Sequence, residues 1–273
     1  MTRIQQRQYN INLNDKIFKP GNVTYNSFNI AFDIPFSQQE DRLNEDLVQV
    51  EYENGYVIDI GWYPEMDPKG SLIIQLIHDH DWNKPVQKTK ITEISELYTA
   101  VHGMKMKALC ATIRKVQPGD ENVLAHIQTE SWKAAFNKIL SPEILDKCTD
   151  INKATAMYKQ LLAENFGNGY ILTANDKPHC IAYWDAARNK EYAEKAELIC
   201  IHSLPDNWNK GYGSLMMDHV LCDIKNAGYS YAILWVFRDN TRARAFYESK
   251  GFSFTGISKS AFDTEEVLYS IDF

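Results

Sequence analysis

One stretch constrains the fold of this chain more than any other, residues 197–214 with the sequence ELICIHSLPDNWNKGYGS. Its apolar run at 198–201 predicts a strand, which Pro205 interrupts. The loop WNKGYG at 208–213 then leads into a helix that begins near Ser214. The first turn of a helix has unpaired N–H groups and a partial positive charge, and glycine lets other groups approach the backbone closely. This order of elements therefore predicts a site for a phosphate-bearing ligand.

The spacing of the glycines excludes two common nucleotide motifs. Gly211 and Gly213 fit neither G-x-x-x-x-G-K-[ST] nor G-x-G-x-x-G. The phosphate must therefore belong to another kind of ligand.

Composition limits the class of protein. A chain of 273 residues with 44% apolar and 24% charged residues is typical of a soluble globular protein of two domains. The net charge of −7 argues against a nucleic-acid surface. We expect no signal peptide, because the N-terminus (MTRIQQRQYN) is polar and has no apolar h-region. We expect no membrane partner, because no apolar run approaches ~18 residues. The five cysteines are scattered without C-x-x-C spacing, which favours buried thiols and a cytoplasmic location.

Residues 1–107 predict a small α+β domain of unknown role. Alternating patterns predict strands, with a hairpin turn at Asn54-Gly55 between the second and third, and residues 91–106 predict one helix. The four predicted strands cover residues 28–34, 47–52, 56–63 and 71–77. His78 and His80 would point the same way from a strand and could both face a metal ion. No third ligand is evident nearby, so we interpret them as solvated residues at a strand end and expect no metal.

Residues 108–273 predict a second domain with a mixed sheet. The order of predicted elements is β-α-α-β-β-β-α-β-α-β-β, with Asp120 as the cap of the first helix. The strand at 231–236 is apolar throughout, as expected where helices cover both faces of a sheet. The fold class is therefore α/β (α+β), with a mixed central sheet and helices on both faces.

Three strings in this second domain resemble the GCN5-related N-acetyltransferase (GNAT) superfamily. They are IRKVQPGDENVLAHIQTESW near its start, WNKGYG in the middle and LWVFRDNTRARAFYESKGF near its end. The likeness runs from about residue 111 to 273, and the last string is its most specific part. The loop pattern of the family is Q/R-x-x-G-x-G/A, in which Gly211 and Gly213 fit and Trp208 replaces the usual Gln or Arg. The N-terminal domain shows no such resemblance.

The resemblance implies acetyl-coenzyme A (acetyl-CoA) as the donor, bound between two strands that splay apart. One strand would end at Ser203 and the other near Val236, and the pantetheine arm would pair with the backbone of the first. A backbone N–H there would also stabilise the oxyanion of the reaction. The implied coenzyme contacts are Ile201, His202, Ser203, Trp208, Asn209, Lys210, Gly211, Tyr212, Gly213, Ser214, Asn240 and Tyr247.

Three residues are candidates for acid–base catalysis. Tyr247 matches the tyrosine of the family that lies beside the sulfur, where a phenol can protonate the departing thiolate. Glu197 and His202 are alternative general bases for the acceptor amine. Their numbers differ by five, so they would share one face of the strand only if a β-bulge separates them. A core tyrosine and a solvated glutamate are the structural alternatives for Tyr247 and Glu197.

Four residues are candidates for the acceptor pocket: Ser131, Trp132, Tyr170 and Trp184. Ordinary packing also explains each of them. We expect an N-acetyltransferase (an acyltransferase of EC class 2.3.1) that moves acetyl to a primary amine of a small molecule or protein. The alternative is a non-catalytic acetyl-CoA sensor whose N-terminal domain binds a protein partner. A homodimer interface, substrate specificity or an immunity-like binding function are further roles open to that domain.

Overall fold

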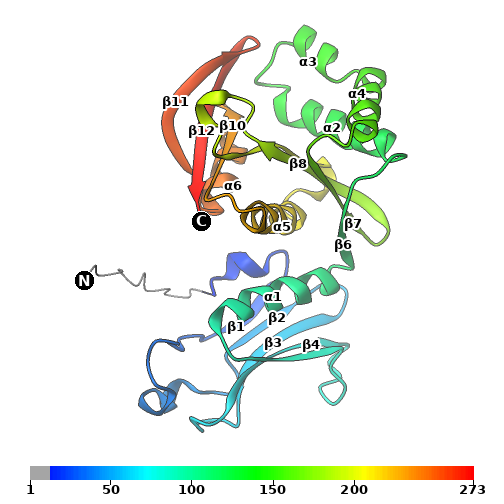
Figure 1. Ribbon diagram of the computed structural model, residues 1–273. Coiled ribbons are helices and arrows are strands. Elements are labelled where there is room, and N and C mark those ends of the chain that lie inside the picture. Colours follow the sequence, from blue (N-terminus) through cyan, green and yellow to red (C-terminus); the bar gives the residue numbers. More distant parts are fainter. Residues whose placement is uncertain (1–12) are drawn as a thin grey trace, which may run out of the picture. The chain divides into compact units, whose positions relative to one another are not determined.

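The computed structural model describes residues 13–273 and divides the chain into two compact units (Figure 1). The units are Met1–Cys110 and Ala111–Phe273. The boundary predicted from sequence lies between residues 107 and 108. No helix within the described part of the chain combines the length and the apolar character needed to cross a bilayer.

The N-terminal unit is an antiparallel sheet with one long helix, as predicted. Its five strands lie in chain order: β1 (Asn22–Asn26), β2 (Val48–Glu51), β3 (Tyr56–Tyr63), β4 (Ser71–His78) and β5 (Gln87–Ile91). Helix α1 (Ile94–Ala108) buries Leu97, Val101 and Met104 in the core of the unit. Three short 3-10 helices are η1 (Asp15–Phe18), η2 (Phe36–Gln38) and η3 (Glu40–Arg42). The predicted hairpin at Asn54-Gly55 joins β2 to β3, and Gly55 has a φ of 82°.

Two predictions for this unit are wrong in detail. Residues 28–34 form no strand, because the buried Gln39 side chain binds their backbone in place of a neighbouring strand. Its Oε1 accepts from Ala31 N (2.9 Å), and its Nε2 donates to the carbonyl oxygens of Ala31 (2.7 Å) and Ile34 (2.9 Å). The predicted helix at 91–106 starts later, at Ile94, because Glu93 and Glu96 form a capping box there.

The C-terminal unit contains a seven-stranded mixed sheet. Its strand order is β11-β12-β10-β9-β8-β7-β6, and only β9 and β10 are parallel neighbours. The strands are β6 (Ala111–Lys115), β7 (Asn168–Ala174), β8 (Lys177–Ala186), β9 (Ala196–Ser203), β10 (Tyr231–Phe237), β11 (Ser253–Ala261) and β12 (Thr264–Asp272). The helices are α2 (Glu121–Phe136), α3 (Pro142–Cys148), α4 (Ile151–Ala163), α5 (Tyr212–Asn226) and α6 (Thr241–Ser249), with short 3-10 turns η4 (Lys190–Tyr192) and η5 (Pro205–Asn207). The predicted order of elements is confirmed, except that the second helical region is two helices, α3 and α4.

Helices cover both faces of this sheet (Figure 1). On one face, Leu124 and Ile127 of α2 and Tyr158 of α4 pack with Tyr183 of β8. On the other, Asp223 of α5 binds side chains of β7 and β8. Side chains of the sheet thus pack against helices on both of its faces, as the fully apolar strand β10 predicts.

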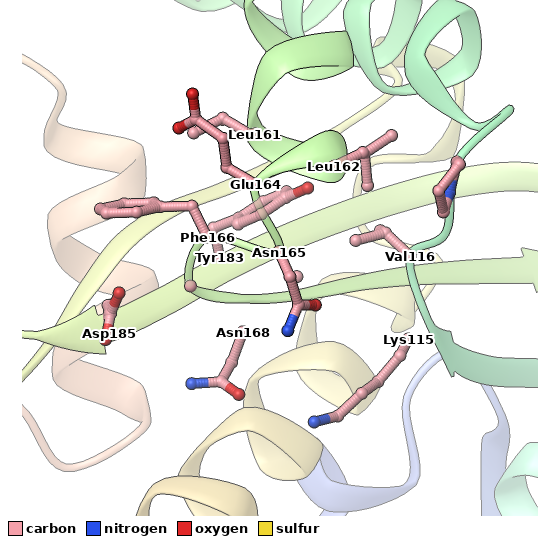
Figure 2. A pocket seen from close by; sticks show the side chains of 13 residues that line it. Lys115, Val116, Leu161, Leu162, Glu164, Asn165, Phe166, Asn168, Tyr183 and Asp185 are labelled. Atoms are coloured by element: carbon pink, nitrogen blue, oxygen red, sulfur yellow. The ribbon is translucent and has the colours of Figure 1, made fainter.

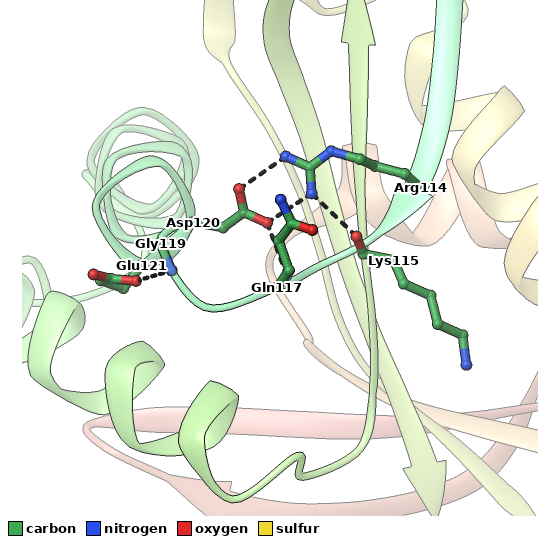
Figure 3. A network of polar contacts seen from close by, with 6 residues as sticks. All are labelled: Arg114, Lys115, Gln117, Gly119, Asp120 and Glu121. Atoms are coloured by element: carbon green, nitrogen blue, oxygen red, sulfur yellow. Dashed lines mark hydrogen bonds and ion pairs between the residues drawn. The ribbon is translucent and has the colours of Figure 1, made fainter.

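An ion pair fixes the start of α2 (Figure 3). Both terminal nitrogens of Arg114 donate to the Asp120 carboxylate, at 2.7 and 2.8 Å, and Asp120 also accepts from Gln117 N at 2.9 Å. The hydrogen bonds from Arg114 lower the pKa of Asp120. Asp120 occupies the N-cap position, but its side chain does not bind a helix N–H as the sequence predicts. It anchors the β6–α2 loop instead.

Candidate functional site

Strands β9 and β10 separate soon after they begin. They pair at only two positions, Ala196 with Ala232 and Glu197 with Ile233, although β9 continues to Ser203 and β10 to Phe237. Within residues 13–273, no other strand pairs with that edge of β9. Its backbone N–H and C=O groups are therefore available to an extended ligand.

A β-bulge in β9 places both candidate bases on one face. Cys200 pairs with Tyr183 and Leu198 with Trp184, so Ile199 is an extra residue in β9. The extra residue reverses the alternation, and Glu197 then faces the same side as His202. This is the face covered by α2, because the His202 ring lies 6.5 Å from the Trp132 ring of that helix.

The loop after β9 leads into the first turn of α5, whose N–H groups lie outside the helical ladder. Asn209 and Gly211 have φ values of 63° and 79°, and Gly211 is the N-cap of α5. The first helical hydrogen bond is donated by Leu215 to the Gly211 carbonyl oxygen. The N–H groups of residues 212–214 therefore precede the helical ladder, an arrangement that binds phosphate.

Trp208 has a defined structural role in this loop. Its Nε1 donates to the Ser203 carbonyl oxygen at 2.9 Å, which ties the loop to the end of β9. The guanidinium carbon of Arg242 lies 3.1 Å from the centroid of its ring. Lys210 Nζ donates to Asn207 Oδ1 at 3.4 Å. The Trp208 indole thus ties the loop to β9 through its N–H group. Its ring also holds the Arg242 guanidinium beside the loop.

Sequence reasoning missed Arg242. It is the second residue of α6 and makes no ion pair within the described part of the chain, and burial lowers the pKa of its guanidinium. A cation with no carboxylate partner among the described residues, held beside the first turn of a helix, favours an anionic ligand. One feature of the sequence could have identified it, because Arg242 lies two residues after Asn240, which is a predicted coenzyme contact.

Asn240 and Tyr247 occupy opposite ends of α6. Asn240 Oδ1 caps the helix by accepting from Ala243 N at 3.2 Å, which leaves its Nδ2 for a ligand. Tyr247 is 9% exposed and packs against Phe246 and Phe252. Burial, with nearby Cys200 and Cys180, raises the pKa of the Tyr247 hydroxyl, so it is a protonated donor at neutral pH.

Glu197 is held by Arg188. The carboxylate is 2% exposed and accepts from Arg188 Nε at 3.1 Å and from Arg188 N at 3.0 Å. Burial would raise the pKa of Glu197, but the hydrogen bonds from Arg188 lower it below its ordinary value. The group is thus an ionised carboxylate whose oxygens are already bound.

His202 is neutral at physiological pH. Burial lowers the pKa of its imidazole to about 4, because no anion compensates the charged form. One ring nitrogen of a neutral imidazole is a hydrogen-bond acceptor. His202 therefore presents a weak base on the α2 face of β9.

The four predicted acceptor residues do not form one cluster. Tyr170 and Trp184 lie under α5, where the Tyr170 hydroxyl and Trp184 Nε1 both donate to Asp223 Oδ2, at 2.5 and 2.9 Å. Ser131 and Trp132 belong to α2 on the opposite face. Ser131 is buried, and only Trp132 shares a face with His202.

Trp132 belongs to an aromatic cluster that the sequence analysis did not identify. Its ring lies 5.0 Å from Phe136, 6.5 Å from Phe237 and 6.3 Å from Phe262. Phe262 is 58% exposed, and Trp132 Nε1 is buried with no hydrogen-bond partner among residues 13–273. This cluster presents an apolar surface and one unused donor beside His202.

The described residues contain no group of three or more His, Cys, Asp or Glu placed to hold a metal ion. His78 lies at the end of β4, with Nδ1 3.4 Å from Asp79.

Comparison with known proteins identifies the class of the C-terminal unit. Residues 129–252 match the model of the "Acetyltransferase (GNAT) family". The fold is similar to PaiA N-acetyltransferase from Thermoplasma acidophilum, solved in complex with coenzyme A (TM-score 0.50, 20% identity, 60% of this chain and 99% of that one). It is also similar to a GCN5-related N-acetyltransferase from Rhodopseudomonas palustris (TM-score 0.50, 15% identity, 59% of this chain and 95% of that one). No curated protein matches the chain.

Residues 129–252 therefore match the GNAT acetyltransferase family, the C-terminal unit has the GNAT fold, and the resemblance found in the sequence is confirmed. Both structural matches cover about three fifths of this chain, and the family model lies wholly within the C-terminal unit.

Proposed function

We propose that the C-terminal unit transfers an acetyl group from acetyl-CoA to a primary amine of a small molecule or protein. The observation that carries this proposal is the edge of β9 that β10 leaves unpaired, followed by the N-terminal turn of α5. The pantetheine arm would extend β9 through residues 201–203, and the pyrophosphate would lie on the N–H groups of residues 212–214. Arg242 and Lys210 would add positive charge, and Asn240 Nδ2 would contact the arm.

The residues of this site support a direct transfer. The amine nitrogen forms a bond to the thioester carbon, and a backbone N–H of β9 stabilises the negative oxygen that results. The C–S bond then breaks, and Tyr247 gives its proton to the departing thiolate. The nitrogen loses a proton as the amide forms, and the phenolate of Tyr247 recovers one, so the proton balance closes.

We propose that the amine enters in its neutral form. Glu197 is bound by Arg188, and an imidazole with a pKa of about 4 is a poor base for an ammonium group whose pKa is ~10.4. His202 would accept a hydrogen bond from the attacking amine and so orient its lone pair. Trp132 and Phe262 would contact the body of the acceptor.

The test is an incubation of the full chain with acetyl-CoA and a panel of amines. The panel contains a polyamine, an aminoglycoside and a peptide with a free N-terminus, and free thiol is followed with time. Thiol release that depends on the amine, with a mass increase of one acetyl group on that amine, is the expected result. Tight binding of acetyl-CoA without thiol release from any amine would overturn the proposal.

That second outcome would favour the non-catalytic sensor. The pairing of Glu197 with Arg188 supports this alternative, because it occupies the carboxylate best placed to act as a base. The N-terminal unit would then recognise a protein partner, and acetyl-CoA would change the affinity for that partner.

A further inference from the structure

One face of the β9–β10 gap is covered by helices. Helix α5 packs on β8 and β9, and α6 lies beside α5, where Lys250 Nζ and Asp218 Oδ1 are 2.5 Å apart. Tyr247 of α6 is 9% exposed and adds to this cover. An amine that attacks a thioester held in the gap therefore has to arrive from the opposite face, which is the face of α2.

The α2 face at the end of this gap is aromatic. The Trp132 ring lies 6.5 Å from His202 of β9 and 6.5 Å from Phe237 of β10, so it bridges the two strands after they have separated. Phe136 and Phe262 lie 4.9 and 6.1 Å from Phe237. Aromatic rings at these distances pack edge to face. An acceptor that approaches His202 from this side meets the surfaces of these rings.

Phe262 is held at this place in an unfavourable backbone conformation. It is the first of two residues, with Asp263, in the turn between β11 and β12, and its φ is 54°. Glycine, asparagine and aspartate adopt such a φ at lower cost than a bulky residue does. Asp263 Oδ2 accepts from Ser141 N at 3.1 Å and so ties the turn to the start of α3. The Phe262 ring remains 58% exposed although it packs on Trp132, and strain combined with exposure favours a role in binding.

Two carboxylates of the sheet on this face are already paired. Glu197 is bound by Arg188. Glu266 is the cross-strand partner of Phe237 and lies 3.3 Å from Lys259 Nζ. A polyamine or an aminoglycoside carries several cationic groups and needs carboxylates to bind them. The face instead suits an acceptor with one amine and an apolar ring.

The cavity beside α4 and β7 cannot hold the acceptor (Figure 2). It has a volume of about 460 Å³, and its described lining comes from α4, β6, β7, β8 and the loops that follow α4 and β6. Strand β8 separates β7 from β9, and none of these lining residues belongs to β9, β10 or α2. An amine bound there is remote from a thioester in the gap, which leaves the aromatic cluster as the acceptor surface.

On the basis of the acetyl transfer proposed above, we propose that the acceptor is a small arylalkylamine, a primary amine on a short chain that ends in an aromatic ring. Its ring packs on Phe262 and Trp132, and its amine lies at His202. The nitrogen bonds to the thioester carbon and loses one proton, the C–S bond breaks, and coenzyme A leaves as the thiol after Tyr247 protonates its sulfur. Phe262 is the residue that selects this acceptor.

The test compares amines by the release of thiol from acetyl-CoA with the full chain. Phenethylamine carries the aromatic ring, ethylamine has the same amine without the ring, and spermidine carries several cationic groups instead. The value of kcat/KM should be about tenfold to a hundredfold higher for phenethylamine than for ethylamine, because burial of the ring stabilises the bound acceptor. Spermidine should react no faster than ethylamine.

Phe262→Asn separates this role from folding. It should lower kcat/KM for phenethylamine about tenfold and leave the value for ethylamine unchanged. Asparagine tolerates the φ of this turn, so relief of strain offsets the lost ring contacts and the midpoint of urea unfolding should stay near that of the wild type. The matched control is Phe254→Asn, an exposed phenylalanine of the same hairpin that packs on Tyr269, 5.8 Å away, on the α6 face. This control should keep the preference for phenethylamine.

A binding measurement adds a readout that needs no turnover. Calorimetric titration of phenethylamine into the chain saturated with coenzyme A should show binding that Phe262→Asn weakens by a similar factor. Equal kcat/KM for the three amines, or an equal loss for phenethylamine and ethylamine in Phe262→Asn, would overturn the acceptor class and leave the proposed acetyl transfer standing. Release of thiol with none of the amines would overturn both.

Discussion

Trp208 and Arg242 form a stacked pair beside the candidate phosphate loop, with the guanidinium carbon 3.1 Å from the ring centroid. The two residues come from different elements, the loop after η5 and the first turn of α6. Trp208 also holds the end of β9 through Ser203. The pair thus joins the three elements that border the proposed coenzyme site. It also gives a physical reason for an indole where the family pattern has Gln or Arg, since stacking leaves the edge of the guanidinium free for a phosphate.

Arg242→Gln should weaken coenzyme A binding about tenfold or more. The substitution removes the charged hydrogen bonds proposed to the phosphates, each worth ~1.5 kcal/mol or more. Part of the lost affinity should be salt-dependent, because exposed charges are screened at high ionic strength. Titration calorimetry at low and high salt measures both effects.

The control for this prediction is Arg238→Gln. Arg238 lies just before α6 but donates to Glu265 at 2.6 Å, so its charge is already paired. Its substitution should leave the affinity for coenzyme A nearly unchanged. A similar loss in both variants would mean that only general electrostatic attraction is involved.

Arg188→Gln should destabilise the fold by roughly 2 kcal/mol at neutral pH. The substitution leaves the buried Glu197 carboxylate without its ion pair, which lowers the free energy of unfolding. The loss is smaller than for a fully buried pair, because the Arg188 side chain is 58% exposed. In the wild type the pKa of Glu197 is lowered, so its contribution to stability is present at neutral pH and is lost as pH falls through that pKa.

The variant should show the opposite pH dependence. Burial without Arg188 raises the pKa of Glu197 above its unfolded value, so protonation at acidic pH relieves the cost. The difference in free energy of unfolding should therefore shrink between pH 7 and pH 4, measured by urea denaturation. Lys147→Gln, which breaks an exposed pair with Glu143, is the matched control. A difference that stays constant over this pH range would contradict the assigned pairing.

Two tyrosine substitutions on neighbouring strands should differ in their effect on stability. Tyr183→Phe removes a hydroxyl that has no partner among the described residues, so the protein should be unchanged or slightly more stable. Tyr170→Phe removes a hydrogen bond to Asp223 and should cost about 1–2 kcal/mol. Thermal and urea unfolding of the two variants, side by side, checks this. A loss for Tyr183→Phe as large as for Tyr170→Phe would mean that its hydroxyl is satisfied.

The sequence predicts local structure well where periodicity and glycine decide it. The order of elements in the C-terminal unit and the hairpin at Gly55 follow from alternation, apolar runs and turn residues alone. Residues 28–34 alternate as a strand does, yet they pair with the side chain of Gln39. A tertiary contact of that kind leaves no trace in the local pattern.

The site shows the same limit. In a regular strand, Glu197 and His202 would lie on opposite faces, because their numbers differ by five. The bulge at Ile199 brings them to one face. The sequence shows that Tyr170 and Trp184 are aromatic, but it does not show which face of the sheet they occupy. The strand register decides this and places both under α5. The pairing of Glu197 with Arg188 and the stacking of Arg242 join residues whose contact no spacing rule indicates.

Tyr247→Phe should lower the rate of acetyl transfer at pH 7 about a hundredfold, if the phenol is the acid that protonates the thiolate. The raised pKa of Tyr247 keeps it protonated across the physiological range, so the deficit should be constant there. A thiol has an ordinary pKa near ~8.5, so the thiolate needs less help to leave at higher pH and the deficit should shrink. Affinity for coenzyme A should change little, because phenylalanine keeps the packing against Phe246 and Phe252.

Tyr231→Phe, on the exposed start of β10, is the matched control. Full turnover of Tyr247→Phe across this pH range would remove the acid role and leave Tyr247 as a packing residue of α6.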